Sequence, residues 1–411
     1  MTQLATQTGL LAEVGTIRAV AAEFGTPVYI IDLPGIVRAM DGLRNGLMTH
    51  YANCEVTYSV KTNYLAAVLR RMLAAGYRLE VVSRREIRQV QLVGATPSQL
   101  LFNGPVKSIA DLEFCYQHSV DVNVDSVDEL EAAAALGSPE RPFRLGIRVA
   151  AALNNGSVSR FGVDFDDADS VAAVGRLISE GSIHVAGLHL HHSSRRDAAS
   201  YCERIDRLRA LARRLGITPE YLDIGGGIGS VPPPSIAARL PYAVDSHEQW
   251  AAVVGRHAQA VFGEGGPKLI VEPGIAVLAG AMNYVTSIVA VKARAGGATI
   301  AVCDGSMFDV NPLRSAIPPP CVLLPSGDSG PVATEPIRLY GGTCMEIDQL
   351  GVLDGEMAPR KGDLAVVTNV GAYSVCLAPD FIVPRAPIYS LDDGALIRHP
   401  EPGEGFRGAG L

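Results

Sequence analysis

The sequence has 411 residues, of which 48% are hydrophobic, and it carries a formal net charge of −8 at pH 7. This length is enough for two domains, or for one large barrel with an appended domain. The negative charge argues against binding to nucleic acid or to an anionic membrane, because either would require a basic surface. No apolar run approaches the roughly 20 residues that a membrane span needs.

The N-terminus and the cysteines both indicate an intracellular protein. The first residues lack the basic start and apolar core of a signal peptide, so we expect a cytoplasmic location. The seven cysteines are scattered, odd in number and never arranged as a CxxC pair. This usage is typical of reduced thiols rather than of disulfides or a structural zinc site.

Short apolar segments alternate with amphipathic ones from about residue 27 to residue 275. We predict strands at 28–31, 56–60, 79–82, 100–102, 120–124, 143–149, 184–190, 221–224 and 269–271, and helices at 34–47, 65–75, 85–93, 109–117, 127–136, 169–180 and 198–215. A repeated strand–helix rhythm favours parallel strands joined by right-handed crossovers. About eight such units predict an α/β fold with a TIM-type (β/α)8 barrel over residues 26–280. An open, doubly wound parallel sheet is the alternative.

The pattern changes after about residue 280, where strand-like segments are separated by few helices. We predict strands at 284–291, 299–303, 337–340 and 364–368, with Pro-rich and Gly-rich breaks between them. Residues 281–411, together with residues 1–25, are therefore expected to form a β-barrel domain. The tail from about residue 400 is rich in glycine and charge, and we expect it to be mobile.

Four segments place chemically useful groups at the ends of predicted barrel strands, where a TIM barrel collects its catalytic residues. Lys61 could attack a carbonyl if burial or a nearby cation lowers the pKa of its amine. The glycines at 225–227 expose backbone amides that could cradle a phosphate. His191 could stack on a cofactor ring and Ser194 could bind phosphate. Glu272 could accept a hydrogen bond from a protonated pyridine nitrogen.

Each segment also has an ordinary structural interpretation when it is taken alone. Lys61 and Glu272 could be solvated, and the glycine run could be a flexible turn. The histidines at 189, 191 and 192 could be a metal site, but a third ligand at suitable spacing is not evident, so we predict no metal. The four segments are specific only in combination and in this order.

Taken in this order, the segments resemble the fold-type III pyridoxal-phosphate decarboxylases, the family of diaminopimelate and ornithine decarboxylases. In that family an alanine-racemase-like barrel is joined to a β domain, and the resemblance extends from about residue 25 to residue 387. It rests on Tyr-Ser-Val-Lys-Thr-Asn at 58–63, Leu-Glu-Val-Val-Ser-Arg-Arg-Glu at 79–86, Phe-Asn-Gly-Pro-Val-Lys-Ser at 102–108, Val-Asn-Val-Asp-Ser at 122–126, Ser-Arg-Phe-Gly at 159–162, the glycine run, Glu-Pro-Gly at 272–274, Gly-Thr-Cys-Met-Glu-Ile-Asp at 342–348 and Val-Gly-Ala-Tyr at 370–373.

The resemblance implies pyridoxal 5′-phosphate as cofactor and a role for each matched residue. Lys61 would hold the cofactor as a Schiff base, His191 would stack on its ring, and Glu272 would pair with its pyridine nitrogen. Glu80 and Glu86 fall where the family places acidic residues near the cofactor. The groups expected to hold the phosphate are Ser194, Gly226, Gly227, Gly274 and Tyr373.

The family also implies a homodimer whose active site is completed across the interface. Cys344 would come from the partner subunit and protonate the carbon that loses CO₂. The partners expected are thus a second copy of the chain and a small amino-acid substrate, with no nucleic acid and no membrane. Contacts with the substrate are expected from Arg160, Arg314, Glu346 and Asp348.

Departures from the family pattern restrict the substrate. Ile275 replaces the arginine that usually follows Glu-Pro-Gly, and Asn311 stands where a diaminopimelate decarboxylase carries an arginine for the distal carboxylate. Met345 replaces the glutamate of the usual Cys-Glu-Ser pattern. We therefore expect decarboxylation of an amino acid or of a conjugated or carrier-bound amino acid. On this interpretation the chain is closer to family members of siderophore and antibiotic pathways than to the housekeeping enzyme.

Three alternatives stay open from the sequence. The chain could be a diaminopimelate decarboxylase of lysine biosynthesis. It could be a pyridoxal-phosphate-dependent amino-acid racemase, which would need a second base opposite Lys61. It could also be a non-catalytic pyridoxal-phosphate-binding protein. The predicted β domain argues against the last two.

Overall fold

The computed structural model describes residues 9–151, 159–192, 195–230, 237, 244–294, 299–315, 317–327, 335–353, 357–392 and 395–400. The predicted mobile tail beyond residue 400 lies outside these ranges. The chain divides into two compact units. One consists mainly of residues 37–229 and 245–276, and the other of residues 1–36, 230–244 and 277–407.

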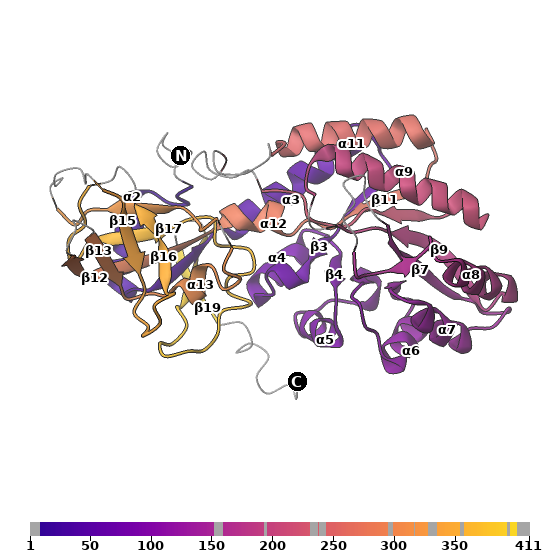
Figure 1. The fold of residues 1–411 in the computed structure, drawn as a ribbon, viewed down its shortest axis with the longest axis horizontal. Helices are drawn as coiled ribbons and strands as arrows, with labels where there is room; N and C mark the ends of the chain where they lie inside the picture. The colour runs from indigo at the N-terminus through magenta and orange to yellow at the C-terminus, as the bar shows by residue number, and fades with distance from the viewer. Residues whose placement is uncertain are drawn as a thin grey trace. The chain divides into compact units, whose positions relative to one another are not determined.

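The first unit is a barrel of parallel strands (Figure 1). Its strands are β2 (Cys54–Val56), β3 (Tyr58–Ser59), β4 (Leu79–Val81), β5 (Leu100–Phe102), β6 (Asp121–Val124), β7 (Phe143–Ala150), β9 (Ile183–His189), β10 (Tyr221–Asp223) and β11 (Lys268–Val271), with the short β8 (Val163–Asp164) paired to β7. The order runs β2-β11-β10-β9-β7-β6-β5-β4-β3, and all neighbours are parallel.

The barrel closes at Thr57, which is the only residue between β2 and β3. Its amide donates a hydrogen bond of 2.8 Å to the carbonyl oxygen of Val271, while the next amide, that of Tyr58, donates to Arg78 on the opposite side. One chain segment therefore pairs with both ends of the sheet. The predicted TIM-type barrel is confirmed, and the open sheet is excluded.

The helices of this unit alternate with its strands. They are α3 (Leu33–Met48), α4 (Ala66–Ala74), α5 (Arg84–Leu92), α6 (Ile109–His118), α7 (Val127–Leu136), α8 (Ala168–Glu180), α9 (Ala198–Leu215) and α11 (His247–Phe262), and α5 to α8 follow one another around the barrel in Figure 1. Every described helix is too short or too polar to cross a lipid bilayer.

Helix starts follow from single polar residues. Ser83, Ser108, Ser126, Asp167 and Asp197 each accept a hydrogen bond from the amide of the third residue beyond them, at the start of α5, α6, α7, α8 and α9. Such N-caps satisfy amides that have no partner within the helix. Because these caps come shortly after strands, they also fix the loops that carry the predicted site residues.

Helix α11 was not among the predicted helices, although the sequence contains its start signal. The Ser246 side chain accepts from the Gln249 amide, and the Gln249 side chain accepts from the Ser246 amide, which is a capping box. Trp250 then packs edge-on against Tyr201 of α9, with 4.9 Å between ring centroids.

The second unit contains a mixed sheet. Its strands are β1 (Val28–Ile31), β12 (Met282–Ala293), β13 (Thr299–Cys303), β14 (Cys321–Leu324), β15 (Ile337–Tyr340), β16 (Gln349–Leu353), β17 (Leu364–Val367), β18 (Ile388–Asp392) and β19 (Ala395–His399), in the order β16-β15-β13-β12-β1-β18-β19 with β17 joining β12 to β14. Its helices are α2 (Val14–Phe24) and the short α13 (Met307–Val310), and the four-residue α12 (Ile275–Leu278) lies at the boundary.

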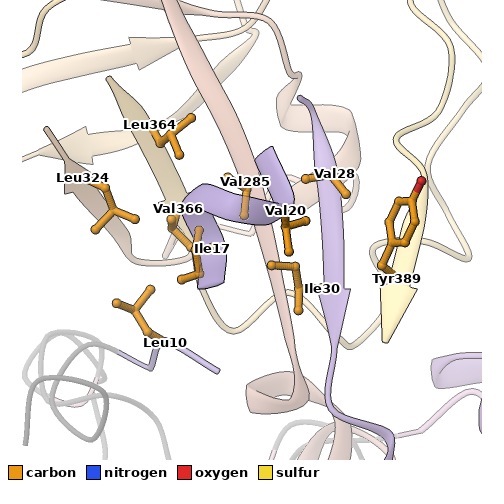
Figure 2. Packing of buried hydrophobic residues seen from close by; sticks show 10 residues of the cluster. All are labelled: Leu10, Ile17, Val20, Val28, Ile30, Val285, Leu324, Leu364, Val366 and Tyr389. Carbon is orange, nitrogen blue, oxygen red and sulfur yellow. The ribbon is translucent and has the colours of Figure 1, made fainter. Parts of the chain in front are cut away.

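The core of this unit includes the N-terminal helix. Ile17 and Val20 of α2 are fully buried, and Figure 2 shows them beside Val285 and Val366 of the sheet. Burying such side chains stabilises a fold by about 1.5–3 kcal/mol each. The helix is therefore an integral layer of the β unit.

One strand belongs to a different sheet from the one predicted. The sequence rhythm places residues 28–31 in the barrel, and this expectation is wrong, because β1 pairs antiparallel with β12 and parallel with β18. All four of its residues are buried. A strand covered on both faces has the same apolar pattern in either sheet, so the pattern cannot identify its neighbours.

Candidate active site

A cavity of about 610 Å³ opens at the carboxyl ends of the barrel strands. This volume lies within the range of small-ligand sites. Lys61, Glu80, Arg160, His191 and Glu272, all predicted from the sequence, line it. They are up to 211 positions apart in the sequence (272 − 61), and the barrel brings them together because its parallel strands end at one face.

Lys61 lies in a single 3₁₀ turn directly after β3. Its Nζ is 2.6 Å from Oε2 of Glu80, which also accepts a hydrogen bond of 2.7 Å from the Ser59 hydroxyl. The Glu80 side chain is only 1% exposed, whereas that of Lys61 is 34% exposed. The buried carboxylate therefore orients the amine at the wall of the cavity while leaving it accessible.

Glu272 and Asp223 form a buried acidic pair at the ends of β11 and β10. Their carboxyl oxygens lie within 4.8 Å of each other and of a ring nitrogen of His189. Burial, and then the neighbouring carboxylates, raises the pKa of Glu272 well above its ordinary value, and burial likewise raises the pKa of Asp223. A cationic group placed against the pair would favour the ionised form of both carboxyl groups.

Amide side chains hold this acidic pair. Asn103 donates to Oε1 of Glu272, and Asn123 donates to Oδ2 of Asp223 at 3.3 Å. Burial lowers the pKa of His189 well below its ordinary value, so the ring is neutral, and neither of its nitrogens has a hydrogen-bond partner in the described part of the chain. Buried polar atoms without partners are rare in folded proteins, so the ring has unused capacity for a bound molecule.

The described part of the chain contains one group of side chains that could hold a metal ion, and it consists of His189, Asp223 and Glu272. This trio differs from the three histidines considered from the sequence. A divalent metal or a protonated ring nitrogen could each supply the positive charge that the carboxyl pair needs.

The glycine run lies against His191. The Gly226 amide donates to Nδ1 of His191 at 3.1 Å, and burial, followed by the charges of Arg204 and Lys61, holds the pKa of His191 well below its ordinary value. A Cβ on Gly226 would be 2.3 Å from the carbonyl oxygen of Glu272. Glycine is thus required here to let the loop approach the strand that carries the acidic group.

Two more residues that were predicted to bind the phosphate, Gly227 and Gly274, also lie in this unit. Gly227 has a φ of +90°, and a Cβ on Gly274 would be 2.1 Å from the hydroxyl of Thr62. Both positions therefore need glycine, the first for its backbone conformation and the second for space. Ser194 lies outside the described residues.

An aromatic ring between two arginines forms another wall. The guanidinium groups of Arg148 and Arg160 lie 4.4 and 4.0 Å from the ring centroid of Phe161. Arg148 also pairs with Asp125 at 3.3 Å. The sequence prediction missed Arg148, although a charged residue near the end of an apolar strand was a usable signal.

The remaining predicted residues belong to the β unit. Cys344, Glu346 and Arg314 are exposed, and Tyr373 is partly buried with a φ of +61°.

Asp348 is 1% exposed and accepts hydrogen bonds from the amides of Met307 and Thr343 and from the hydroxyls of Thr343 and Ser306. A carboxylate with four donors has little capacity left for a substrate, so its contacts favour holding the turn that precedes Cys344.

Comparison with known proteins identifies the family. Residues 36–279 match the family described as pyridoxal-dependent decarboxylase, pyridoxal binding domain. A diaminopimelate decarboxylase from Actinosynnema pretiosum subsp. auranticum is 30% identical over 392 residues, which cover 91% of this chain and 86% of that protein.

Solved structures share the two-part fold. The diaminopimelate decarboxylase from M. jannaschi has a TM-score of 0.80 and 19% identity, covering 96% of this chain and 94% of that chain. The lysine/ornithine decarboxylase from Vibrio vulnificus, complexed with cadaverine, has a TM-score of 0.76 and 22% identity, covering 93% of this chain and all of that chain.

The cavity fits the cofactor of this family on three observations. Its lining presents an accessible amine on Lys61 and the Glu272 carboxyl of a buried pair, for which a protonated pyridine nitrogen is a suitable cationic partner. The Gly226 amide, at a loop position with no room for a side chain, donates to the lining residue His191. The Glu272–Asp223 pair thereby has an explanation that does not require a metal. The chain belongs to the pyridoxal-dependent decarboxylases, and it is a pyridoxal-phosphate-dependent amino-acid carboxy-lyase.

Proposed function

We propose that this enzyme decarboxylates an amino acid or amino-acid conjugate in a natural-product or siderophore pathway, with Lys61 as the residue that holds the cofactor. The observation that carries the cofactor assignment is that Lys61, Glu80 and Glu272 line one cavity, with Lys61 paired to Glu80 and Glu272 beside the buried Asp223. An aldehyde bound at the amine could place its ring nitrogen toward the carboxyl pair.

In this proposal the chain supplies orientation and charge. Pyridoxal phosphate, when bound, withdraws electrons from the α-carbon of the substrate and so allows its carboxylate to leave as CO₂. Lys61 holds the cofactor until the substrate amine replaces it, and Glu80 orients the Lys61 amine. The Glu272 carboxylate would accept a hydrogen bond from the protonated ring nitrogen, and His191 would pack against the ring. Cys344 donates a proton to the carbon that has lost CO₂.

The glycines proposed to bind the phosphate are assigned from the geometry of their backbone. Gly226, Gly227 and Gly274, with Ser194 and Tyr373, are proposed to hold the phosphate. The tight approach of Gly226 to β11 and of Gly274 to Thr62 supports this assignment, because both keep bare backbone near the strand ends.

The substrate assignment rests on residues of the second unit that depart from the family pattern. Asn311, at the position of the expected arginine, is engaged within its own turn: its side chain accepts from the Ser315 amide at 2.8 Å and donates to the Ser315 carbonyl oxygen at 3.2 Å. Arg160 remains as a cation on the cavity wall, without an acidic partner among the described residues. A substrate other than diaminopimelate is the interpretation that these residues favour.

A homodimer completes the proposal. Met345 and Ile347, next to the exposed Cys344, are 37% and 39% exposed. Apolar side chains beside a predicted acid favour a partner surface that covers them, and we propose that Cys344 acts in the active site of the second subunit. Diaminopimelate decarboxylation is the second candidate function, because the relatives reported above carry that name.

The test has two parts. The purified protein should absorb visible light, and borohydride should fix the cofactor on the peptide that contains Lys61, with Lys61→Ala losing both properties. Trapped CO₂ from a panel of amino acids and conjugates should then identify a substrate with kcat/KM at least about 100-fold above that for diaminopimelate. Diaminopimelate as the best substrate would refute the pathway assignment. An unlabelled Lys61 in a coloured protein would refute the cofactor site.

A further inference from the structure

A fully buried arginine lies beneath the glycine run and the histidine segment. Arg204 projects from α9 and is 0% exposed. Its guanidinium donates to the carbonyl oxygens of Ile224 (2.8 Å) and Gly226 (3.3 Å) on one side. On the other side it donates to those of His192 (2.8 Å) and Arg195 (3.0 Å). One side chain thus connects the two loops proposed to carry the phosphate groups.

The charge of this guanidinium is not neutralised by a carboxylate of the described residues. Among the described residues Arg204 forms no ion pair, and its four hydrogen-bond acceptors are all neutral carbonyl groups. The acidic residue close enough to influence it, Asp197, is itself paired with Arg195 at 3.1 Å. The guanidinium also lies 3.9 Å from the ring centroid of Tyr201. A buried cation without a counter-charge is unfavourable unless a bound group supplies one.

The four hydrogen bonds also set the direction of the peptide groups. In a planar trans peptide the C=O and the following N–H point in opposite directions. Because the Gly226 carbonyl points at Arg204, the Gly227 amide points away from it, and that amide has no acceptor among the described residues. The Tyr201 hydroxyl donates to the same Gly226 carbonyl at 3.0 Å and reinforces this orientation.

We propose that Arg204 is a positioning residue for the phosphate of the cofactor: it holds both loops by their carbonyl groups, turns the Gly227 amide outward, and has its charge balanced by the phosphate dianion. This inference rests on the proposed assignment of the glycine loop to the phosphate. It adds a residue that touches no reacting atom and acts through the backbone.

The test compares cofactor forms with and without the phosphate. Pyridoxal 5′-phosphate and pyridoxal are titrated into cofactor-free wild-type protein and into Arg204→Met and Arg204→Lys, with the visible absorbance of the bound aldehyde as the readout. We expect Arg204→Met to weaken pyridoxal-phosphate binding at least about 100-fold, while pyridoxal binding changes less than about threefold. Arg204→Lys should be intermediate, because it keeps the charge but loses the planar set of donors.

Arg207→Met is the matched control. Arg207 lies one helical turn further along α9, is 38% exposed and pairs with Glu203. This variant should bind both aldehydes as the wild type does, whereas a loss equal to that of Arg204→Met would overturn the proposal.

The other contrary outcomes are distinct. If Arg204→Met weakens the binding of both aldehydes by the same factor, the arginine has only a structural role and the proposal is wrong. If Arg204→Met does not fold, Arg204→Lys decides, because an unchanged preference for the phosphate form would overturn the proposal. If the wild type itself shows no such preference, the phosphate assignment of the loops fails, and this inference fails with it.

Discussion

Buried carboxyl groups dominate the chemistry of the site at the scale of single residues. Glu80, Asp223 and Glu272 are each at most 3% exposed, and Glu80 and Glu272 line a cavity with a single accessible amine among the described residues. Burial disfavours the charged forms of Asp223 and Glu272, and the neighbouring carboxylates add to this effect at Glu272. A cofactor with a cationic ring relieves this penalty, so binding and charge balance are coupled.

Glu86 allows the cost of a buried acid to be measured away from this coupled pair. It is 8% exposed, its Oε2 accepts from the Val82 amide at 2.8 Å, and burial raises its pKa from 4.5 to about 7. The folded state therefore binds more protons than the unfolded state between these values. Its contribution to stability is complete below pH 4.5 and is lost as the pH rises through about 7.

Glu86→Gln should remove this pH dependence, because glutamine cannot ionise but can still accept from the Val82 amide. Between pH 5 and pH 8 we expect the variant to lose less stability than the wild type, by on the order of 2 kcal/mol, in urea unfolding of the cofactor-free protein. Glu113→Gln, at an exposed position of α6, should not change the pH dependence. An equal difference from the wild type at both pH values would argue against an ionisation effect.

Sequence motifs identified strand-end residues that line the cavity, but they did not identify the partner of each group. Lys61, His191 and Glu272 were found because each follows an apolar segment in a recognisable order. Asp223 precedes the glycine run and was assigned no role, since its proximity to Glu272 arises only from the pairing of β10 with β11. A carboxyl group acquires its altered pKa from neighbours that are distant in the sequence.

At the scale of elements, the loop after β10 packs so closely against the residue that follows β11 that a side chain at Gly226 has no room. A Cβ on Gly226 would meet the Glu272 carbonyl oxygen at 2.3 Å, a contact with backbone that no rotamer change relieves. The loop and the start of the Glu-Pro-Gly segment must therefore shift together if a side chain is added.

Gly226→Ala should weaken cofactor binding by about 10- to 100-fold and destabilise the fold by about 1–3 kcal/mol, the usual cost of overpacking. Absorbance titration with pyridoxal phosphate and thermal unfolding measure the two effects. Gly175→Ala in α8 is the control, because its added methyl group meets no atom within 4 Å. That variant should be neutral or slightly stabilised, as alanine favours a helix. Similar behaviour of the two variants would contradict the steric argument.

Most barrel elements were predictable, because a local apolar period indicates each strand or helix and a capping residue indicates the start of most helices. The errors concern elements whose identity depends on contacts. Residues 28–31 were correctly predicted as a strand but placed in the wrong sheet, because β12 and β18 are far away in sequence. Helix α11 was overlooked despite its capping box at 246–249.

At the scale of the whole molecule, the proposed role of Cys344 in a second subunit can be tested with two copies of the chain. Lys61 belongs to the barrel unit and Cys344 to the β unit. If Cys344 acts in the partner's site, a dimer of one Lys61→Ala subunit and one Cys344→Ala subunit contains one site with both residues intact.

Mixing the two inactive variants after subunit exchange should restore up to about a quarter of the wild-type activity, as random pairing makes half the dimers mixed and each has one intact site. Trapped CO₂ measures the recovery, and size-exclusion chromatography establishes the dimer. Each variant incubated alone should stay inactive. No recovery from a mixture that has demonstrably exchanged subunits would place both residues in one chain's site or remove Cys344 from catalysis.

The sequence by itself determined the strand–helix rhythm, its strand ends and the position of Lys61, because hydrophobic period, caps and short motifs are local properties. The closure of the strands into a barrel was decided by the hydrogen bonds of Thr57 and Tyr58 to opposite ends of the sheet. Only the tertiary structure decided that β1 joins the β unit, that Asp223 shares the buried position of Glu272, and that Arg204 lies beneath both loops. These facts depend on groups that are brought together from distant parts of the chain. Burial, and the lack of a counter-charge for Arg204 among the described residues, are properties of the packed structure, and no single segment encodes them.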